Sequence, residues 1–554
     1  MIPPLTSVRV EALEASAPSY DEFLEAGRAA LSRGAWSAAR SQFERAVGLA
    51  TTPEALEGLS WATWWLEDVQ ACLDAREQSY RLYRLAGDAR SAARMALWLG
   101  DDHNEFQGAD AVAEGWFNRA TRLLDGLEPC PELGWLRVFD AHAALGRHDT
   151  GRARELAVQA QELGRRHQAV DLEMFSLATE GLALVEEGAV EQGMRCLDEA
   201  TAAALGGEYE NLAPAAWTCC RLISACEEIR DYERGAQWCR QVQEFSRRME
   251  ARFVTGVCRA HYAAILGWHG DWSGAELELT EAQQDLTANR PYWRAEAVVR
   301  LGELRRRQGR SDEAEALFNE VPWHSLAKRG LAELSLDRGD PAAARDVLVR
   351  MLRRIPPGSV SRAWPLELVV RADAALRDDE AAAAHLAEFC SIATALGTRP
   401  LRGAARFAEG VHAAAGGEHE KACVCFEDAV ELYDGLAPYE AGHTRLELAR
   451  SLLALGRTDA ARREARTALA AIPVPSRNAA ALLTTLDLHS NTVLSARQLD
   501  VLRLIASGLG DREIAGQLVL SEHTVHRHVA NIYTRLGCST RAAAVSQATQ
   551  LGLL

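Results

Sequence analysis

Apolar residues near the C-terminal end of the chain recur at helical spacing. The pattern consists of Val525, Val529, Ile532 and Leu536. Spacings of three and four residues place these side chains on one face of an α-helix. Ser521 precedes the run, and its hydroxyl can accept a backbone N–H of the first helical turn. The pattern therefore predicts an amphipathic helix that begins after Ser521 and carries a polar face opposite its apolar stripe.

Three shorter helical patterns surround this run. Apolar residues predict a first helix within 494–506, a second over 511–518 and a fourth over 541–551. The second and third predicted helices are joined by a tight turn, which is the arrangement of a helix-turn-helix. The second helix of such a pair can enter the major groove of DNA, which is roughly 12 Å wide.

A different pattern runs along the rest of the chain and returns roughly every 40 residues. It consists of a glycine, a small residue five positions later, a bulky apolar residue nine later and a small residue twelve later. The best copies begin at Gly34, Gly108, Gly188, Gly270, Gly309, Gly417 and Gly456. Several copies add a small residue seven positions before the glycine, at Gly27, Gly181, Gly302 and Gly410. Weaker copies centre near Glu67, His148, Arg230, Gly339 and Arg377.

Each copy is interpreted as one helical hairpin. The glycine permits a tight turn between helices, the small residues allow close approach, and the bulky residue fills the seam. A hairpin with an unburied apolar face must stack on its neighbours. The expected organisation is a lead over 1–18, about twelve hairpins over 19–472, a linker over 473–491 and a helix-turn-helix domain over 492–554. The repeat pattern resembles the tetratricopeptide repeat, although its period is longer.

Composition indicates a folded chain with an uneven charge. The sequence is 48% hydrophobic, and no run of 18 apolar residues is present. The first sixteen residues do not resemble a secretory signal, so we expect a cytoplasmic protein without a membrane partner. Net charge is −17, but residues 490–554 hold six arginines against four acidic residues. An acidic body repels DNA, so any DNA binding must come from the tail.

Catalytic and metal-binding patterns are missing from the sequence. The twelve cysteines contain no CxxC pair, and we expect them to be reduced and mostly buried. A phosphate-binding loop needs GxxxxGK[ST], and the only two lysines, Lys328 and Lys421, do not fit it. We therefore expect no enzyme activity, no cofactor and no metal ion.

Residues 494–554 resemble the LuxR-type (GerE-like) DNA-binding domain of bacterial transcription regulators. The matching segments are LSARQLDVLRLIASGL, REIAGQL and LSEHTVHRHVANIYTRLGCSTRAAAV. The long repeat period is similar to that of the arrays in large LuxR-type regulators of the MalT family, here without their ATPase module. This resemblance implies an all-α protein, a tetratricopeptide-like superhelix of helical hairpins followed by a four-helix domain that regulates transcription.

The resemblance also implies roles for residues of the tail. Residues that reach base edges are expected at His523, His526, Arg527 and Ala530. Phosphate contacts are expected at Arg512, Ser521, Thr524 and Arg535. The last helix resembles the family's dimer contact, with Val545, Ala548 and Leu551. The expected partners are double-stranded DNA, a second copy of the chain, an effector bound by the repeats and RNA polymerase.

Two clusters in the body have alternative interpretations. The first cluster consists of Trp61, Trp64 and Trp65. Its rings are interpreted as core packing between hairpins or, alternatively, as an aromatic wall for a ligand in a groove. The run 305–307, three arginines, favours a solvated helix face over an anion site. An alternative function for the whole chain is a protein-binding scaffold whose tail does not bind DNA.

Overall fold

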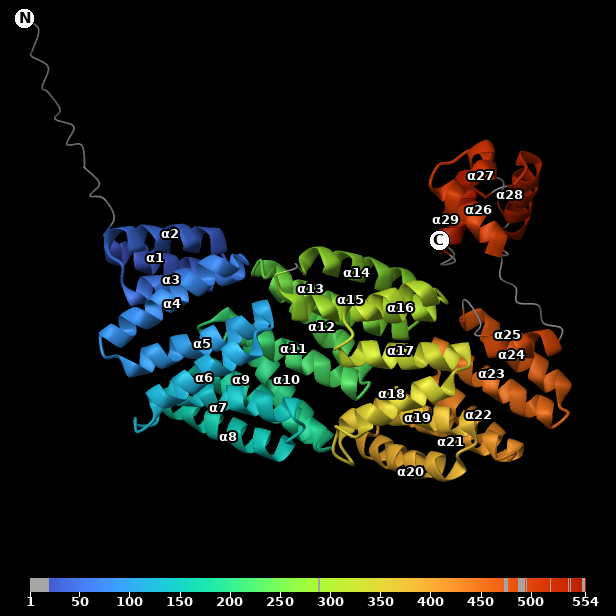
Figure 1. Ribbon diagram of the computed structural model, residues 1–554, viewed down its shortest axis with the longest axis horizontal. Coiled ribbons are helices and arrows are strands. Elements are labelled where there is room, and N and C mark those ends of the chain that lie inside the picture. The colour runs from blue at the N-terminus through green and yellow to red at the C-terminus, as the bar shows by residue number, and fades with distance from the viewer. Residues whose placement is uncertain are drawn as a thin grey trace, which may run out of the picture. The chain divides into compact units, whose positions relative to one another are not determined.

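The structure is a computed structural model in which all regular elements of the described residues are helical (Figure 1). The described residues are 19–286, 289–472, 477–486, 494, 496–518, 520–536, 538, 540–550 and 554. The predicted all-α class is thus confirmed. The predicted lead and most of the predicted linker lie outside the described residues. None of the described helices combines the length and apolar character that a bilayer crossing needs.

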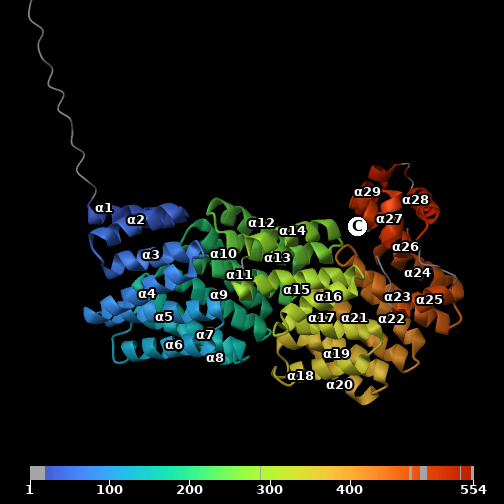
Figure 2. The same cartoon turned by 45° about the horizontal axis from the view of Figure 1, so that its top comes forward.

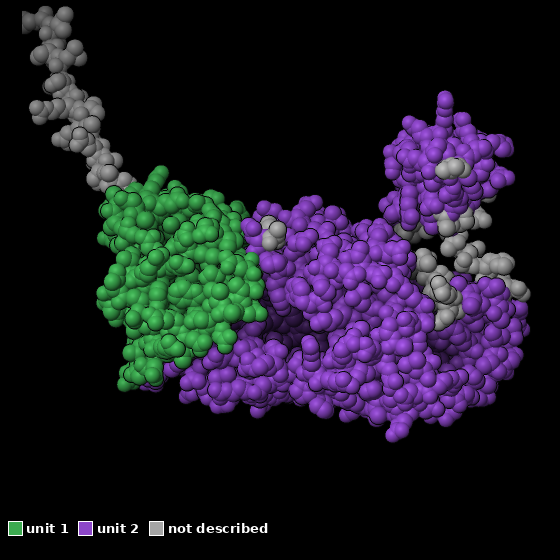
Figure 3. Space-filling view, in the orientation of Figure 1, with its two compact units in different colours: residues 1–128, 248–251 green, residues 129–247, 252–554 purple. Residues whose placement is uncertain are grey.

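The chain divides into two compact units, residues 1–128 with 248–251 and residues 129–247 with 252–554 (Figure 3). The helices of unit 1 are α1 Tyr20–Ser32, α2 Trp36–Leu49, α3 Pro53–Trp65, α4 Val69–Leu85, α5 Ala89–Gln107 and α6 Asp110–Leu124.

Unit 2 holds most of the remaining helices of the repeat region. They are α7 Pro131–Gly146, α8 Thr150–His167, α9 Val170–Glu186, α10 Val190–Gly206, α11 Leu212–Glu228, α12 Tyr232–Arg248, α13 Arg252–Trp268, α14 Trp272–Asp285, α15 Pro291–Arg307, α16 Ser311–Glu320, α17 Ser325–Arg338, α18 Pro341–Leu352, the 3-10 helix η1 Val360–Arg362, α19 Ala363–Leu376, α20 Asp379–Leu396, α21 Arg399–Ala415, α22 His419–Tyr433, α23 Pro438–Ala454 and α24 Thr458–Ala471. Consecutive helices pack as hairpins that stack on their neighbours (Figure 2).

The hairpin turns follow the sequence pattern. The glycines of the seven best copies all adopt the left-handed conformation, with φ between 59° and 87°. The weaker copies turn in the same way, and there the residues are Glu67, His148, Arg230, Gly339 and Arg377. Four of these five are not glycine, and such residues reach positive φ only when the surrounding packing imposes it. The position in the repeat therefore sets the turn even where the residue does not favour it.

The bulky residue of several copies lies against glycines of the facing helices. Phe318 is 1% exposed, and a Cβ added at Gly302 or Gly330 would come within 2.6 Å or 2.2 Å of its ring. Phe43 lies in the same way between Gly27 and Gly58. Because interiors are packed at crystal-like density, these glycines are required for the ring of the facing helix to enter. Ring and glycine together fix how closely successive hairpins stack.

The hairpins of unit 2 curl until distant segments meet. The hydroxyl of Ser361 donates to Glu186 at 2.9 Å, across 175 residues of sequence. The hydroxyl of Thr398 donates to the carbonyl of Ile229 at 2.7 Å, across 169 residues. Separations this similar indicate that the array returns to its own surface after a little more than four hairpins.

The arginine run of α15 is not a solvated face, contrary to the prediction. Arg306 and Arg307 are 7% and 4% exposed, and Arg305 donates to Glu276 at 2.6 Å. Carboxylates from α15 itself, α17 and α23 surround the two buried guanidiniums. Buried arginines require such partners, because an unpaired charge in a low-dielectric interior is strongly destabilising.

Glu228, at the end of α11, gives a pH-dependent contribution to stability. Burial and the neighbouring carboxylates of Glu186 and Glu227 raise the pKa of Glu228 to about 8. The folded chain therefore keeps this proton to higher pH than the unfolded chain, where the pKa of a glutamate is about 4.3. The stability that the protonated Glu228 side chain contributes is complete below about pH 4.3 and is lost as the pH rises from there toward 8.

Glu228→Gln, which mimics the protonated acid, is expected to become progressively more stable than the wild type between pH 5 and pH 8. The stability difference should grow with pH at the slope expected for the titration of about one group. Denaturant midpoints measured across this range report the difference. Glu199→Gln, on the exposed surface of α10, is the matched control and should show no such trend. A constant difference between Glu228→Gln and the wild type across the range would contradict the raised pKa.

Candidate nucleic-acid interface

The C-terminal segment forms a separate four-helix cluster within unit 2. Its helices are α26 Ala496–Ala506, α27 Asp511–Leu518, α28 Glu522–Leu536 and α29 Arg541–Gln550, and α25 Arg477–Thr485 precedes them. The apolar stripe of α28 lies in the core of this cluster, with Val525 and Ile532 fully buried. α27 and α28 pack against each other as a helix-turn-helix.

Ser521 caps α28. Its hydroxyl oxygen accepts the backbone N–H of Thr524 at 3.1 Å and lies 2.7 Å from the Thr524 hydroxyl. The hydroxyl thus satisfies one of the backbone donors that every helix leaves unpaired at its start. Ser521 and Thr524 were both predicted to contact phosphate, and their hydroxyls meet at the N-terminus of the helix, where partial positive charge favours an anion.

Ser521→Ala is expected to lower the stability of the C-terminal cluster by about 0.5–2 kcal/mol, because the cap is lost. Amide hydrogen exchange in α28, recorded as the temperature is raised, measures this change in stability. Ser546→Ala, on the exposed side of α29, serves as the control. Ser521→Asp should keep the helix cap while adding a negative charge. Unchanged stability together with weakened DNA binding would separate the capping role of Ser521 from its predicted phosphate contact. Equal stability of Ser521→Ala and the wild type would exclude the cap.

The face of α28 opposite its buried stripe is exposed. It presents all four predicted base-reading residues, His523, His526, Arg527 and Ala530. Asn531 is also exposed there and lies one turn beyond Arg527. Asn531 was not among the predicted base-reading residues, although its four-residue spacing from Arg527 was a usable signal. Histidine, arginine and asparagine side chains on one helix face can bond base edges in a major groove.

Asp511 connects three helices beneath this face. Its carboxylate accepts the guanidinium of Arg541 at 2.5 Å, and Arg541 also donates to the carbonyl of Leu509 at 2.7 Å. The other carboxylate oxygen lies 3.5 Å from Nδ1 of His526. This bridge fixes α27 to α29 and orients one histidine of the exposed face, which reduces the entropy lost on binding a partner.

The remaining predicted tail residues divide into three groups. Arg512 is exposed on α27 and is available to a phosphate. The side chain of Arg535 and the whole of Leu551 lie outside the described residues. Ala548 is fully buried, and Val545 is half-buried against the same core, so the prediction that Ala548 contacts a second copy is wrong. Any dimer contact through α29 must use its exposed side, where Ala542, Ala543, Ser546 and Thr549 lie.

The tryptophan cluster belongs to the core of unit 1. Trp64 and Trp65 are 1% and 9% exposed, and Trp65 stacks on Trp36 with ring centroids 4.5 Å apart. Trp61 packs edge-on against Trp98 at 5.2 Å. These rings fill space between hairpins, so the alternative of an aromatic wall for a ligand is corrected to core packing.

Known proteins resemble this chain mainly in its tail. Residues 492–548 match the family model of bacterial regulatory proteins, luxR family. The Fimbriae Z protein of Escherichia coli (strain K12) is 52% identical over 46 residues, which cover 8% of this chain and 22% of that protein. The probable transcriptional regulatory protein NarL of Mycobacterium tuberculosis (strain ATCC 25618 / H37Rv) is 47% identical over 62 residues, 11% of this chain and 29% of that protein.

One large relative shares the same segment. The HTH-type transcriptional regulator MalT of Serratia proteamaculans is 40% identical over 65 residues, 12% of this chain and 7% of that protein. The chain thus spans less than a third of the length of these relatives. Together with the four-helix fold, the matches identify the C-terminal segment as a LuxR-type helix-turn-helix domain.

Among solved structures, the chain is similar to the APC/C hetero-tetramer Cut9-Hcn1. That comparison gives a TM-score of 0.44 and 14% identity, and covers 97% of this chain and 96% of the other. Yeast Tom70 gives a TM-score of 0.33 and 12% identity over 81% of this chain and 96% of the other.

Proposed function

We propose that the protein is a bacterial transcription regulator that binds double-stranded DNA through α28. The exposed polar face of α28 supports this proposal most directly, because it lies within a segment that matches a family of DNA-binding regulators. Arg527 bonds a guanine edge, and His523, His526 and Asn531 contact neighbouring bases. Arg512, Ser521, Thr524 and Arg535 hold the phosphates and fix the register of the helix in the groove.

Binding as a dimer follows from the small size of the domain. One tail offers few cationic groups, and single DNA-binding modules contact DNA over a limited area. Two tails that pair through the exposed side of α29 double the number of phosphate contacts. The acidic body contributes no attraction to DNA, so the repeat array acts as the sensing or docking part. An effector that prefers one arrangement of the array shifts the population of chains able to bind DNA.

Selection from a pool of random duplexes tests this function. The full chain is expected to enrich a motif of two half-sites related by two-fold symmetry. The affinity should fall with salt, with a slope on logarithmic axes of about −0.9 per phosphate contact. A chain that enriches no sequence would instead support the scaffold alternative. A single unrepeated half-site would contradict the dimer while leaving DNA binding intact.

A further inference from the structure

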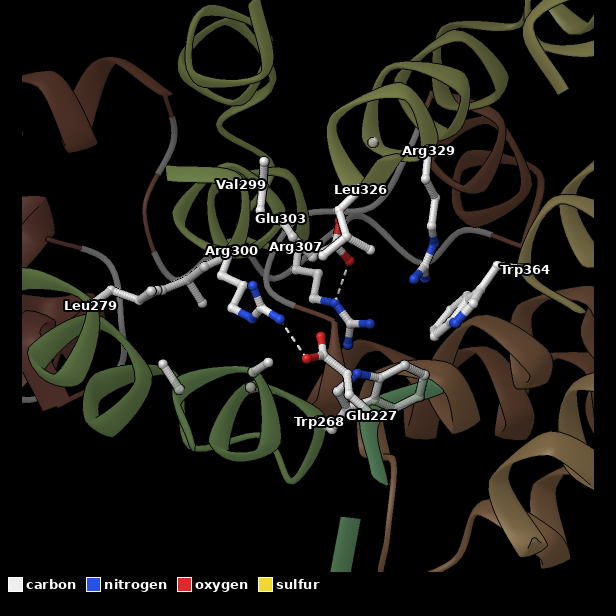
Figure 4. A pocket seen from close by; sticks show the side chains of 15 residues that line it. Glu227, Trp268, Leu279, Val299, Arg300, Glu303, Arg307, Leu326, Arg329 and Trp364 are labelled. Atoms are coloured by element: carbon white, nitrogen blue, oxygen red, sulfur yellow. Dashed lines mark hydrogen bonds and ion pairs between the residues drawn. The ribbon is translucent and has the colours of Figure 1, made fainter. Parts of the chain in front are cut away.

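Unit 2 contains a partly open cavity of about 240 Å³ along the first helices of successive hairpins. Side chains from α13, α15, α17, α19, α21, α22 and α23 line it. A smaller cavity of about 60 Å³ adjoins it, and the two share Trp268, Arg307, Arg329 and Trp364 (Figure 4). The larger cavity therefore lies where the curl of the array brings helices distant in sequence together.

Most charged groups around the cavity are paired with one another. Arg306 contacts Asp337 at 3.1 Å and Glu333 at 2.5 Å, and Arg329 contacts Glu333 at 3.1 Å. Arg329 also lies 3.1 Å from the centroid of the Trp364 ring, a cation–π contact. These groups form a fixed wall, because each guanidinium is held by carboxylates or by an aromatic face.

Three buried atoms of the lining have no hydrogen-bond partner within the described protein: Nη1 of Arg307, Oε2 of Glu440 and Nε2 of His443. The Arg307 side chain is only 5% exposed. Its Nε donates to Glu303 at 2.7 Å, and its Nη2 pairs with Glu440 Oε1 at 2.8 Å. Figure 4, which draws the smaller adjoining cavity, shows the Arg307 side chain among the residues that line it. A buried donor and a buried acceptor left unpaired are costly, so both are suited to an incoming ligand.

The end of the cavity near His443 favours an anionic group. Burial and the guanidiniums of Arg371, Arg306 and Arg307 lower the pKa of His443 to about 3, so its imidazole is neutral. Arg371 lines this cavity and makes no hydrogen bond or ion pair among the described residues. A multiply charged anion is disfavoured, because carboxylates line the same space.

We propose that this cavity binds a small zwitterion whose carboxylate and ammonium groups are attached to the same carbon atom, the chemistry of a free α-amino acid. Arg307 and Glu440 are joined by an ion pair, so the free donor of one lies beside the free acceptor of the other. Arg307, Arg371 and His443 hold the carboxylate, and Glu440 holds the ammonium. The rings of Trp268 and Tyr439 lie against the Arg307 guanidinium, 4.7 Å and 4.9 Å from their centroids, and hold it in place. Leu336, Phe407 and Val411 offer an apolar surface to the rest of the ligand.

This inference names an effector class for the sensing role proposed above, but the binding itself does not require DNA. Calorimetry on the full chain with each of the twenty L-amino acids tests it. At least one compound should bind saturably, and inorganic phosphate and a neutral sugar should not. Arg371→Gln should weaken that binding about 10- to 100-fold, the loss expected for a charged hydrogen bond. Arg353→Gln removes the same charge from an exposed site and should bind as the wild type does.

Glu440→Gln separates the two halves of the site. It should weaken binding of the amino acid, while the corresponding acid that lacks the amino group binds as it does to the wild type, which also shows that the variant is folded. The proposal is overturned if no compound of the panel binds, if Arg371→Gln binds normally, or if phosphate or the sugar binds in their place. Failure of DNA binding would leave each of these results unchanged, so the two proposals fail separately.

Discussion

Replacing Phe318 by alanine is expected to lower the free energy of unfolding of unit 2 by about 3–5 kcal/mol. The ring is 1% exposed and lies against Gly302 and Gly330, whose lack of a side chain leaves nothing to fill the space that it vacates. The cluster around it includes Val298, Val299 and Leu334. The loss therefore combines the transfer of a buried ring with a cavity that helices cannot readily close.

Denaturant unfolding followed by circular dichroism measures this effect as a shift of the midpoint. The control is Leu277→Ala on α14, where the leucine is 59% exposed, and its change should stay within about 0.5 kcal/mol. Hydrogen exchange should show the loss of protection in α15, α16 and α17 before more distant hairpins, because repeat arrays are stabilised by neighbours. A shift for Phe318→Ala as small as that of the control would refute the seam as a main source of stability.

Replacing Arg527 by alanine is expected to weaken binding to the preferred duplex by about 1–3 kcal/mol, roughly 5- to 150-fold. The side chain is exposed on the face of α28 that carries His523 and His526. A guanidinium that bonds a guanine edge in two places discriminates against other bases, so its removal should relax preference at one base pair and leave the others unchanged.

Arg503→Ala is the matched control for this change. Arg503 is exposed on α26, outside the proposed groove-reading face. Its replacement by alanine removes the same charge as Arg527→Ala does. It should lower affinity for all duplexes equally, if at all, and leave the base preference intact. Anisotropy titrations with the selected duplex and its single-base variants distinguish the two arginines. An unchanged base preference for Arg527→Ala would remove this residue from the reading of bases.

The turns of the repeat array could be predicted from the sequence because a spacing, rather than a single residue type, defines them. The glycine pattern predicted the position of each best copy, and the weaker copies at Glu67, His148, Arg230 and Arg377 also turn there. The apolar stripe of α28 was equally visible, since three- and four-residue spacing is a local property of one helix.

Contacts between segments far apart in sequence could not be predicted in this way. The arginines of α15 were predicted to form a solvated helix face. Local sequence could not show their burial, because Glu440, which pairs with Arg307, lies 133 residues further along the chain. The burial of Ala548 depends likewise on how α29 packs against α26 and α28. Helical periodicity marks an apolar face, but it does not tell whether that face meets its own domain or a second copy.

The most direct test of the central claim, that the exposed face of α28 reads duplex DNA, is a competition titration. The full chain is bound to the selected duplex at about 150 mM salt and competed with a scrambled duplex of equal length. We expect the selected duplex to bind at least about a thousandfold more tightly than the scrambled one. Equal affinity for the two duplexes, or no binding to either, would contradict the account.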